Sequence, residues 1–230
     1  MCERSDTVTV KGLFTRKLVG LLAFAIGVLA AGYPLHHSYQ SQQNQLEVKV
    51  SDLEMKYAGL NKENEHLRYI QNLSVEFSMD PLIVTLVDQY SRQYLKKGTA
   101  EWRLLKTPEF LTYVMLSVIY AESKGNPGAI GDGGRARGLT QIWATTAKDY
   151  GNVSPEALLD PETNISYSFR HFHELLKKYK GNLALVLYAW NRGPGTVDKL
   201  ILYGQAPENG YGLKVYQASL NSNRDYVLAN

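Results

Sequence analysis

The chain has 230 residues, 44% hydrophobic and 20% charged, which suits a folded domain with an appendage and excludes a disordered chain. Its 25 Lys and Arg against 22 Asp and Glu give a formal charge of +3. This balance lacks the concentrated basic excess of a nucleic-acid binder, so no nucleic acid is expected as a partner. The single cysteine, Cys2, excludes an intramolecular disulfide framework and a cysteine-rich zinc site.

The first distinct segment is an uncharged run at residues 18–35, LVGLLAFAIGVLAAGYPL. Eighteen helical residues span about 27 Å, enough to cross a hydrocarbon core, and predict a transmembrane anchor. Basic residues precede the run, and the next one after it is Lys49, so residues 1–17 are expected to form a short cytoplasmic segment. A cleaved signal peptide is the alternative, because Ala30, Ala31 and Gly32 are small residues at its end.

A heptad pattern follows within residues 38–74, which we expect to form a coiled-coil stalk. The d positions are leucines, and the a positions hold Val, Tyr and Asn: Leu46, Leu53, Leu60 and Leu67 at d, with Val50, Tyr57 and Asn64 at a. A lone Asn at an a position is a known means of setting register. Self-association through residues 46–67 is therefore predicted. An amphipathic helix that packs on its own domain is the alternative.

Residues 75–230 have the pattern of a helical domain. Helix starts are indicated by a capping residue followed by proline at Asp80-Pro81, Thr107-Pro108 and Asp160-Pro161. Lys124 and Gly125 indicate the end of the helix that begins at Thr107. Because no sustained alternation of period two is present, the fold class is predicted to be all-α or nearly so.

Two sequence motifs are rejected as ligand sites. The glycines at 131–134 follow no predicted strand, so they do not indicate a dinucleotide loop. His171 and His173 lie two residues apart on a predicted helix and point in different directions. Neither a metal nor a cofactor is expected.

Glu122 is the candidate catalytic residue. It lies at the end of an apolar predicted helix, where an ionised carboxylate is expensive to bury. If it is half-buried, its pKa is raised, as a general acid for glycoside cleavage requires. If it points outward, it is an ordinary surface residue.

Four motifs in order resemble the catalytic domain of the soluble lytic transglycosylases. They are Glu122-Ser123, the segment 134–141 (GRARGLTQ), the segment 160–165 (DPETNI) and the segment 188–195 (YAWNRGPG). The resemblance covers about residues 108–200, and the segment around Tyr211 is similar to the family's closing tyrosine segment. Thr140, Trp190 and Arg192 depart from the family pattern, and Thr140 is expected to alter one contact in the cleft. The resemblance implies a lysozyme-like, mainly helical fold.

The same resemblance implies an enzyme that cleaves peptidoglycan glycan strands between N-acetylmuramic acid and N-acetylglucosamine. Glu122 would protonate the glycosidic oxygen and then, as a base, assist closure of a 1,6-anhydro ring on the muramoyl sugar. Other residues are expected to bind substrate: Ser123, Gly138, Gln141, Tyr188, Trp190, Asn191 and Tyr211. Tyr211 is also the residue expected to contact Glu122.

Two alternatives to a membrane-anchored lytic transglycosylase remain from the sequence. A lysozyme-type hydrolase would need a second carboxylate, for which Asp132 is the candidate. A wall-penetrating component of a phage particle or secretion machine would use local muramidase activity or only dock on the wall. The predicted location is the inner membrane, with a single pass and the catalytic domain in the periplasm; a virion-associated location is the alternative.

Overall fold

The computed structural model describes residues 33–97, 105, 107–208 and 210–215. The chain divides into two compact units, Met1–Asn64 and Glu65–Asn230. The predicted cytoplasmic segment 1–17 and nearly all of the predicted anchor 18–35 lie outside the described residues. No helix in the described part of the chain combines the length and the apolar character needed to cross a membrane.

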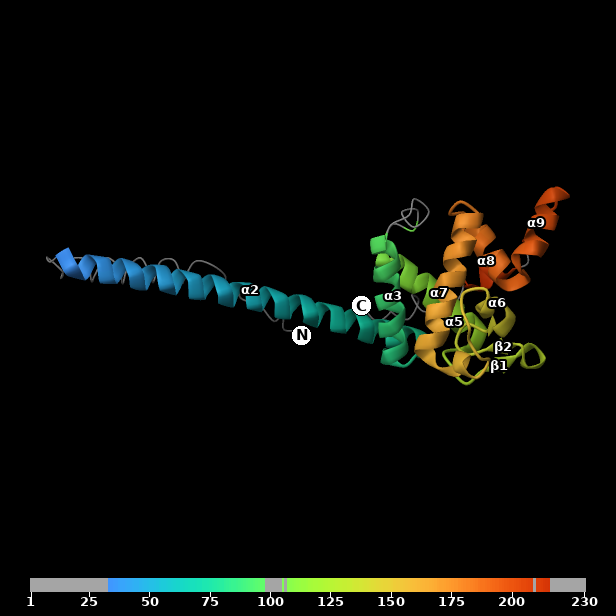
Figure 1. Cartoon of the computed structure of the whole chain (residues 1–230), viewed down its shortest axis with the longest axis horizontal. Coiled ribbons are helices and arrows are strands. Elements are labelled where there is room, and N and C mark those ends of the chain that lie inside the picture. The colour runs from blue at the N-terminus through green and yellow to red at the C-terminus, as the bar shows by residue number, and fades with distance from the viewer. Residues whose placement is uncertain (1–32, 98–104, 106, 209, 216–230) are drawn as a thin grey trace, which may run out of the picture. The chain divides into compact units, whose positions relative to one another are not determined.

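Helix α2 (Tyr33–Phe77) is a single long helix that contains the whole predicted stalk (Figure 1). Its last turns contribute Ile70, Leu73 and Phe77 to the hydrophobic core of the second unit. The second compact unit begins at Glu65, within this helix. The helical periodicity runs unbroken through this point, so the change from an exposed helix to a packed one leaves no break in the pattern.

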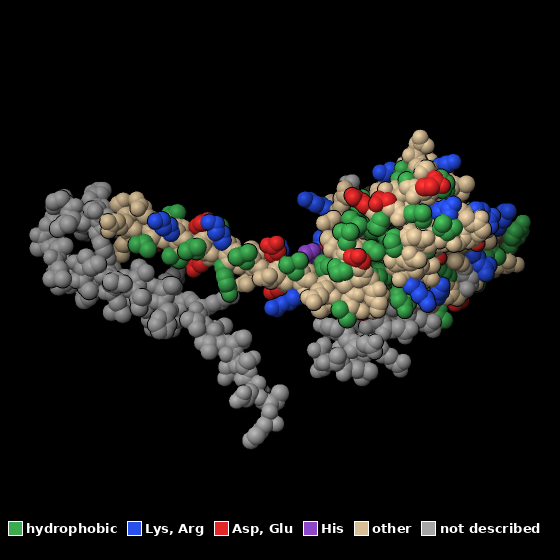
Figure 2. Space-filling model, turned by 90° about the horizontal axis from the view of Figure 1, so that it is seen from below, with side chains coloured by type: hydrophobic (Ala, Val, Ile, Leu, Met, Phe, Trp, Pro, Cys, Tyr) green, Lys and Arg blue, Asp and Glu red, His purple; other side chains and the backbone are tan. Residues whose placement is uncertain are grey.

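The predicted heptad leucines are exposed in the single chain. Leu46, Leu53, Leu60 and Leu67 retain 57%, 64%, 59% and 57% of their accessible surface. Hydrophobic, acidic and basic side chains are mixed along this helix surface (Figure 2). A row of large apolar residues in water is costly, and each would be stabilised by about 1.5–3 kcal/mol if fully buried.

The core of the second unit is built around α5 (Pro108–Ser123), which packs against α3 (Pro81–Lys97). Thr107 caps α5 by accepting a hydrogen bond from the backbone of Phe110 at 3.2 Å, and Pro108 occupies the first turn, as predicted. Every residue from Val114 to Ile119 is buried. Apolar residues on all sides of a helix are typical of one enclosed by its neighbours. The end of α5, which carries Glu122, is thus held by a rigid core.

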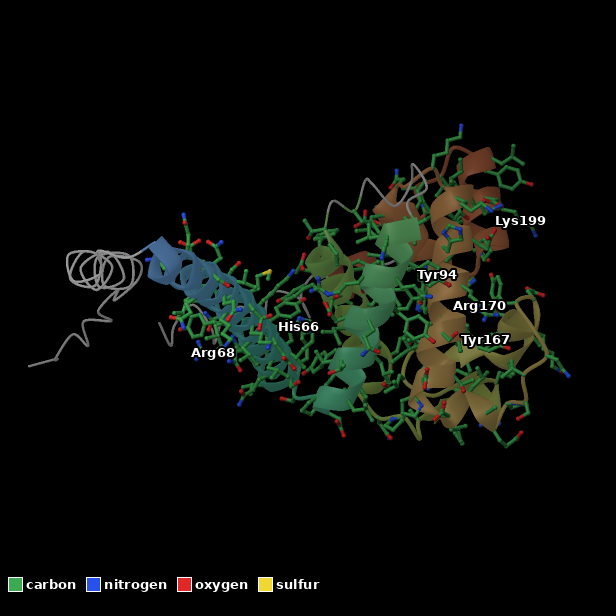
Figure 3. The ribbon with its side chains drawn as sticks, turned by 60° about the vertical axis from the view of Figure 1, so that its left-hand side comes forward. His66, Arg68, Tyr94, Tyr167, Arg170 and Lys199 are labelled. Carbon is green, nitrogen blue, oxygen red and sulfur yellow. The ribbon has the colours of Figure 1, made fainter. Side chains whose placement is uncertain are left out.

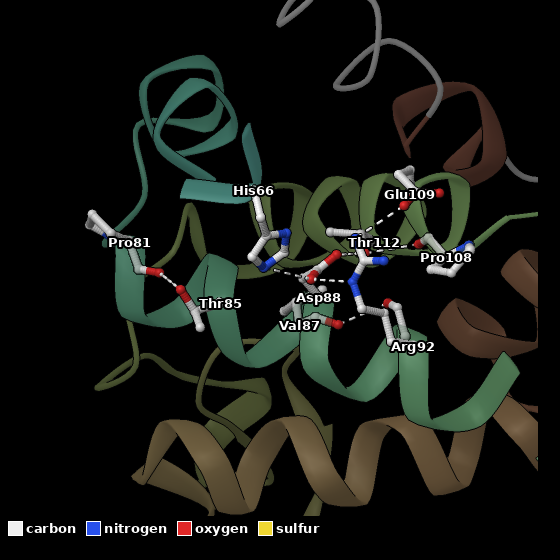
Figure 4. A network of polar contacts seen from close by, with 10 residues as sticks. His66, Pro81, Thr85, Val87, Asp88, Arg92, Pro108, Glu109 and Thr112 are labelled. Carbon is white, nitrogen blue, oxygen red and sulfur yellow. Dashed lines mark hydrogen bonds and ion pairs between the residues drawn. The ribbon is translucent and has the colours of Figure 1, made fainter. Parts of the chain in front are cut away.

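A buried carboxylate links α2, α3 and α5 (Figure 4). Asp88 is 1% exposed and accepts a 2.8 Å hydrogen bond from Nε of Arg92. Thr112 Oγ1 lies 3.3 Å from Asp88, and His66 Nε2 lies 3.5 Å from it. A buried carboxylate that lost its partners would destabilise the fold strongly. Asp88 therefore fixes the register in which α5 packs on α3.

Helix α7 (Pro161–Lys178) is amphipathic and packs on α3 and α8 (Leu183–Arg192). Asp160 caps it by accepting a 2.8 Å hydrogen bond from the backbone of Thr163, as its sequence predicts. Its buried face holds Ile165, Phe169, Phe172 and Leu176. Short helices α6 (Ala144–Lys148) and α9 (Pro194–Leu202), and the 3₁₀ helices η1 (Asp132–Gly134) and η2 (Ala157–Leu159), complete the unit.

The second unit also contains a small antiparallel sheet in addition to its helices. Strands β1 (Ile130–Gly131), β2 (Ala136–Arg137) and β3 (Ile142–Trp143) lie in the order β1-β2-β3. Ile130 pairs with Arg137, and Ala136 pairs with Trp143. Two-residue strands are too short to show alternation, which is why the sequence pattern does not reveal them. Gly131, Gly133 and Gly134 lie where the chain turns from β1 to β2.

Candidate active site

A cleft of about 730 Å³ opens in the second unit, and Glu122 lies on its wall. The cleft brings together parts of the chain that are distant in sequence: the end of α5, the small sheet, α6, α7 and the junction of α8 with α9. Of the predicted site residues, Glu122, Gln141, Trp190 and Asn191 line it. Asp132, the alternative second carboxylate, also lines it.

Glu122 lies one residue before the end of α5 and is neither buried nor fully exposed. The helix stops there because Lys124 adopts the left-handed conformation, with φ of 55°. Gly125 follows with φ of 79°, next to the side chain of Met79, where a Cβ would lie 2.9 Å from Met79 Cγ. The abrupt end of the helix places the carboxyl group at the cleft instead of inside the core.

Tyr211 holds the carboxyl group in place. Its hydroxyl donates a 2.6 Å hydrogen bond to Oε1 of Glu122, so the contact expected between these residues is present. Tyr211 is only 5% exposed, and it comes from a segment 89 residues further along the chain. In the same segment, Lys214 Nζ donates a 2.7 Å hydrogen bond to the carbonyl of Ala121. These two bonds fasten residues 210–215 to the end of α5.

Burial raises the pKa of Glu122 above its ordinary value, and the negative charge of Asp132 raises it further. The hydrogen bond from Tyr211 and the positive charge of Lys214 act in the opposite direction. The net rise keeps the carboxyl group protonated to a higher pH than an exposed glutamate. The two opposing contacts also stabilise the carboxylate once the proton has left, so the group can act as an acid and then as a base.

Gln141 supports the loop that faces Glu122. Its backbone is left-handed, with φ of 51°, and its side-chain Nε2 donates to the carbonyls of Ala129 (3.1 Å) and Gly138 (2.9 Å). A Cβ on Gly131 would collide with Oε1 of Gln141. The amide thus closes the glycine-rich loop and shapes one wall of the cleft.

Gly138 lies behind this wall rather than on it. It is buried, with φ of 68°, and a Cβ there would collide with the carbonyl of Leu158 and the amide of Asn164. Asn164 is fully buried and donates to the carbonyls of Arg137 (2.9 Å) and Leu158 (2.8 Å). The absence of a side chain at Gly138 therefore allows Asn164 on α7 to hold the loop.

The structure contradicts the expectation that Thr140 alters a contact in the cleft. It is 1% exposed, donates from its backbone to Asn164 Oδ1 at 3.1 Å, and places its hydroxyl 2.9 Å from that oxygen and 2.6 Å from Ser168 Oγ. It is absent from the residues that line the cleft. Threonine at this position thus adds a buried polar tie between the loop and α7 and does not alter a cleft contact.

Two further predicted residues lie outside the lining of the cleft. Ser123 donates its hydroxyl to the carbonyl of Ile119 at 3.3 Å, a bond within α5. Tyr188 is half-buried and packs beside Gly212, where a Cβ would lie 3.2 Å from its ring. Tyr188 thereby helps to seat the segment that carries Tyr211.

The cleft also contains Tyr150 and His171, which the sequence did not predict as site residues. Tyr150 and His171 line it together, with the Tyr150 hydroxyl 2.9 Å from His171 Nδ1. Trp143, which is 39% exposed, lines it as well, and the guanidinium of Arg135 lies 4.6 Å from its ring centre. The apolar face of α7 suggests a structural role for His171, so only the tertiary structure shows that the cleft reaches it.

Within the described ranges, no group of three or more His, Cys, Asp and Glu side chains could hold a metal ion. His171 contacts Tyr150 and Trp190, whereas the ring of His173 lies 6.0 Å from that of Tyr94 on α3. The two histidine side chains therefore point in different directions and contact different residues, as their spacing of two on the helix predicts.

A half-buried carboxyl group in a polar cleft, held by a tyrosine and accompanied by aromatic side chains, is an arrangement suited to acid-catalysed cleavage of a glycosidic bond. Residues 103–209 match the family model described as the transglycosylase SLT domain. Over this range the chain is therefore similar to the transglycosylase SLT family.

Among solved structures, the chain is similar to the 70 kDa soluble lytic transglycosylase of Escherichia coli, with 24% identity and a TM-score of 0.44. The match covers 50% of this chain and 22% of that one. The chain thus spans only about a fifth of the length of the enzyme that it matches.

Proposed function

We propose that this protein cleaves the glycan strands of peptidoglycan between N-acetylmuramic acid and N-acetylglucosamine and leaves a 1,6-anhydro-muramoyl end. Glu122 donates its proton to the glycosidic oxygen while the bond from that oxygen to C1 breaks. The acetamido group of the muramoyl sugar stabilises the positive charge at C1. The Glu122 carboxylate then takes the proton of the C6 hydroxyl, and O6 bonds to C1, so no water is consumed.

The observation that carries this proposal is the pair formed by Glu122 and Tyr211. The 2.6 Å bond orients the carboxyl group toward the cleft, and burial raises its pKa above the ordinary value. Tyr211 remains a neutral donor, because burial and the neighbouring Glu122 raise its pKa well above the ordinary value. One carboxyl group supported in this way suits a reaction in which the same residue acts first as acid and then as base.

The test is the mass of the products. The full-length chain in detergent is incubated with purified peptidoglycan, and the released fragments are analysed by mass spectrometry. Transglycosylation gives anhydro-muropeptides, whereas hydrolysis adds water and gives fragments about 18 Da heavier per cleavage. Fragments with only reducing ends would overturn the proposed reaction and favour the hydrolase.

Asp132 provides a second test of the same choice, because it lines the cleft with Glu122. In a transglycosylase, Asp132→Asn removes only a negative charge that raises the pKa of Glu122. We expect the rate to change by no more than about threefold, as for a modest change in one electrostatic interaction. In a hydrolase that uses Asp132 as its second carboxylate, the same substitution abolishes activity.

We further propose that the N-terminal third anchors the enzyme in the inner membrane with its catalytic domain in the periplasm. The uncharged run at 18–35 and the basic residues before it support this location. The stalk is proposed to pair with a second copy of the chain, because the d-position leucines are exposed along α2.

Sedimentation of the full-length chain in detergent tests the stalk. Leu53→Glu places a charge at a d position, whereas Lys62→Glu introduces the same residue at an outward position. Dimers or small oligomers should be lost in the first variant and kept in the second. A parent chain that sediments as a monomer would refute the pairing and leave the enzyme proposal intact.

A further inference from the structure

The cleft also holds a hydrogen-bonded pair, Tyr150 and His171, that is separate from the contacts of Glu122. His171, on α7, is only 9% exposed, yet it lines the cleft together with Tyr150 and Trp190. A buried imidazole is costly unless its nitrogens are hydrogen-bonded. Here the Tyr150 hydroxyl, 2.9 Å from Nδ1, supplies one such bond.

Tyr150 is itself attached to α7. Nη1 of Arg170 donates a 3.0 Å hydrogen bond to the Tyr150 carbonyl, and the Arg170 guanidinium lies 5.1 Å from the ring centre of Tyr167 (Figure 3). Next to Tyr150, Gly151 has no side chain, and a Cβ there would lie 2.8 Å from the Tyr167 hydroxyl. The backbone of Tyr150 is thus held by α7, and its hydroxyl lies against His171.

The pair also determines where the imidazole proton lies. Burial lowers the pKa of His171 to about 4, with the charge of Asp149 opposing it, so the ring is neutral at physiological pH. Burial raises the pKa of Tyr150 to about 12, so its hydroxyl keeps its proton. An imidazole nitrogen is a better acceptor than a phenol oxygen. We therefore assign the Tyr150 hydroxyl as donor to Nδ1, which leaves the ring proton on Nε2.

Nε2 is available to a ligand. No residue in the described part of the chain is hydrogen-bonded to it, and it is not among the side-chain atoms there that are sealed from solvent without a partner. The ring of Trp190 lies beside it, with the two ring centres 5.1 Å apart at an angle of 45°. An aromatic ring next to a fixed N–H donor suits a sugar, which has an apolar face and polar acceptor groups.

We propose that Tyr150 and His171 form a subsite in which His171 Nε2 donates a hydrogen bond to the acetamido carbonyl of an N-acetylated sugar in the cleft, with Trp190 against the sugar face. The inference rests on the proposed function, because it takes the ligand of the cleft to be a peptidoglycan glycan. The acetamido carbonyl is the strongest neutral acceptor that such a strand offers. The subsite recognises the sugar and takes no part in the proton transfers of Glu122.

The experiment measures binding of the tetramer of N-acetylglucosamine by calorimetry, in a Glu122→Gln background that prevents turnover. His171→Phe removes the donor and keeps a ring, and we expect the dissociation constant to rise about tenfold, which corresponds to about 1.4 kcal/mol. His171→Gln restores an N–H near the position of Nε2, and its constant should stay within about threefold of the background. Tyr150→Phe removes the hydroxyl that keeps the ring proton on Nε2, so we expect the dissociation constant to rise several-fold.

His173→Phe is the matched control, since it lies on the same helix, outside the lining of the cleft. Its binding should equal that of the background. A second ligand, the tetramer of glucosamine without acetyl groups, should bind the background and His171→Phe equally. Equal binding of the acetylated tetramer by the His171→Phe and His173→Phe variants would overturn the subsite, and so would failure of the background protein to bind the tetramer.

The test of the subsite can fail independently of the test of the proposed reaction. Formation of anhydro-muropeptides by the His171→Phe variant with an unchanged KM would refute the subsite and leave the proposed function standing. Loss of anhydro products in the unmodified chain would refute the proposed function, whatever the calorimetry shows. Thermal unfolding of each variant establishes that it is folded, and Tyr150→Phe tests the pair if His171→Phe fails to fold.

Discussion

Glu122 and His171 lie in one cleft, and burial shifts the pKa of each in the direction that favours its neutral form. The pKa of Glu122 rises, and that of His171 falls to about 4. The neighbours make the difference. Tyr211 and Lys214 stabilise the carboxylate of Glu122, whereas the Asp149 charge is the one contribution that favours a charged His171. Burial thus favours the neutral form of both groups, whereas Tyr211 and Lys214 also stabilise the charged form of Glu122.

The largest effect is expected from Glu122→Gln, which removes the exchangeable proton and retains the shape of the side chain. The rate of anhydro-muropeptide release should fall by about 10²–10⁴-fold, the usual contribution of a general acid or base. Ser123→Ala is the control, because Ser123 lies next in the chain but outside the cleft lining. A variant that keeps more than a tenth of the activity would show that Glu122 is not the acid.

Tyr211→Phe should have an intermediate effect. It removes the 2.6 Å hydrogen bond that orients the carboxyl group, and we expect a rate loss of about tenfold, consistent with a lost hydrogen bond to a charged group. Because this bond lowers the pKa of Glu122, its loss should move the alkaline limb of the pH–rate profile to higher pH. A limb that moves to lower pH would contradict the assigned role.

A smaller effect is expected on stability. The folded state binds the Glu122 proton more tightly than the unfolded state, so the parent loses stability as pH rises from the ordinary glutamate range through the raised pKa. Glu122→Gln should therefore have a higher Tm than the parent at pH 7. Thermal scans by circular dichroism at pH 7 and pH 4 test this, and the gain should vanish at pH 4.

The smallest effect concerns His171, which we expect to show no titration between about pH 5 and 8, unlike an unperturbed histidine near pH 6.5. Its imidazole resonance, assigned from the spectrum of the His171→Gln variant, should titrate with a midpoint of about 4. A midpoint above 6 would show that the ring carries a charge in the working range. The two groups of the cleft would then differ less than the structure indicates.

Several features of the fold follow from local sequence. Thr107 and Asp160 cap helices where they are predicted to, because a short polar side chain needs only the backbone of its own next turn as a partner. Glu122 falls at a helix end because Lys124 and Gly125 stop the helix there. The heptad on α2 also depends on spacing alone, although its pairing with a second copy stays a prediction.

The long-range contacts of the site are of another kind. Asn164 is predicted as part of a motif at a helix start, yet its buried amide holds the glycine-rich loop by bonds to Arg137 and Leu158. The three two-residue strands exist only through their pairing with one another. The motif resemblance correctly anticipates that Tyr211 meets Glu122, but no spacing rule connects residues 89 positions apart.

The sequence by itself determined the helical class, the main helix boundaries and the position of the candidate acid at a helix end, because these depend on periodicity, caps and the types of neighbouring residues. Only the tertiary structure decided that Thr140 and Gly138 lie behind the cleft and that Tyr150 and His171 lie on it. The physical reason is that the burial of a group and the charges around it depend on many residues together. Folding brings these residues to the site from α5, α7, α8 and residues 210–215. Together they set the pKa of Glu122 and the proton position on His171, and so the chemistry of the cleft.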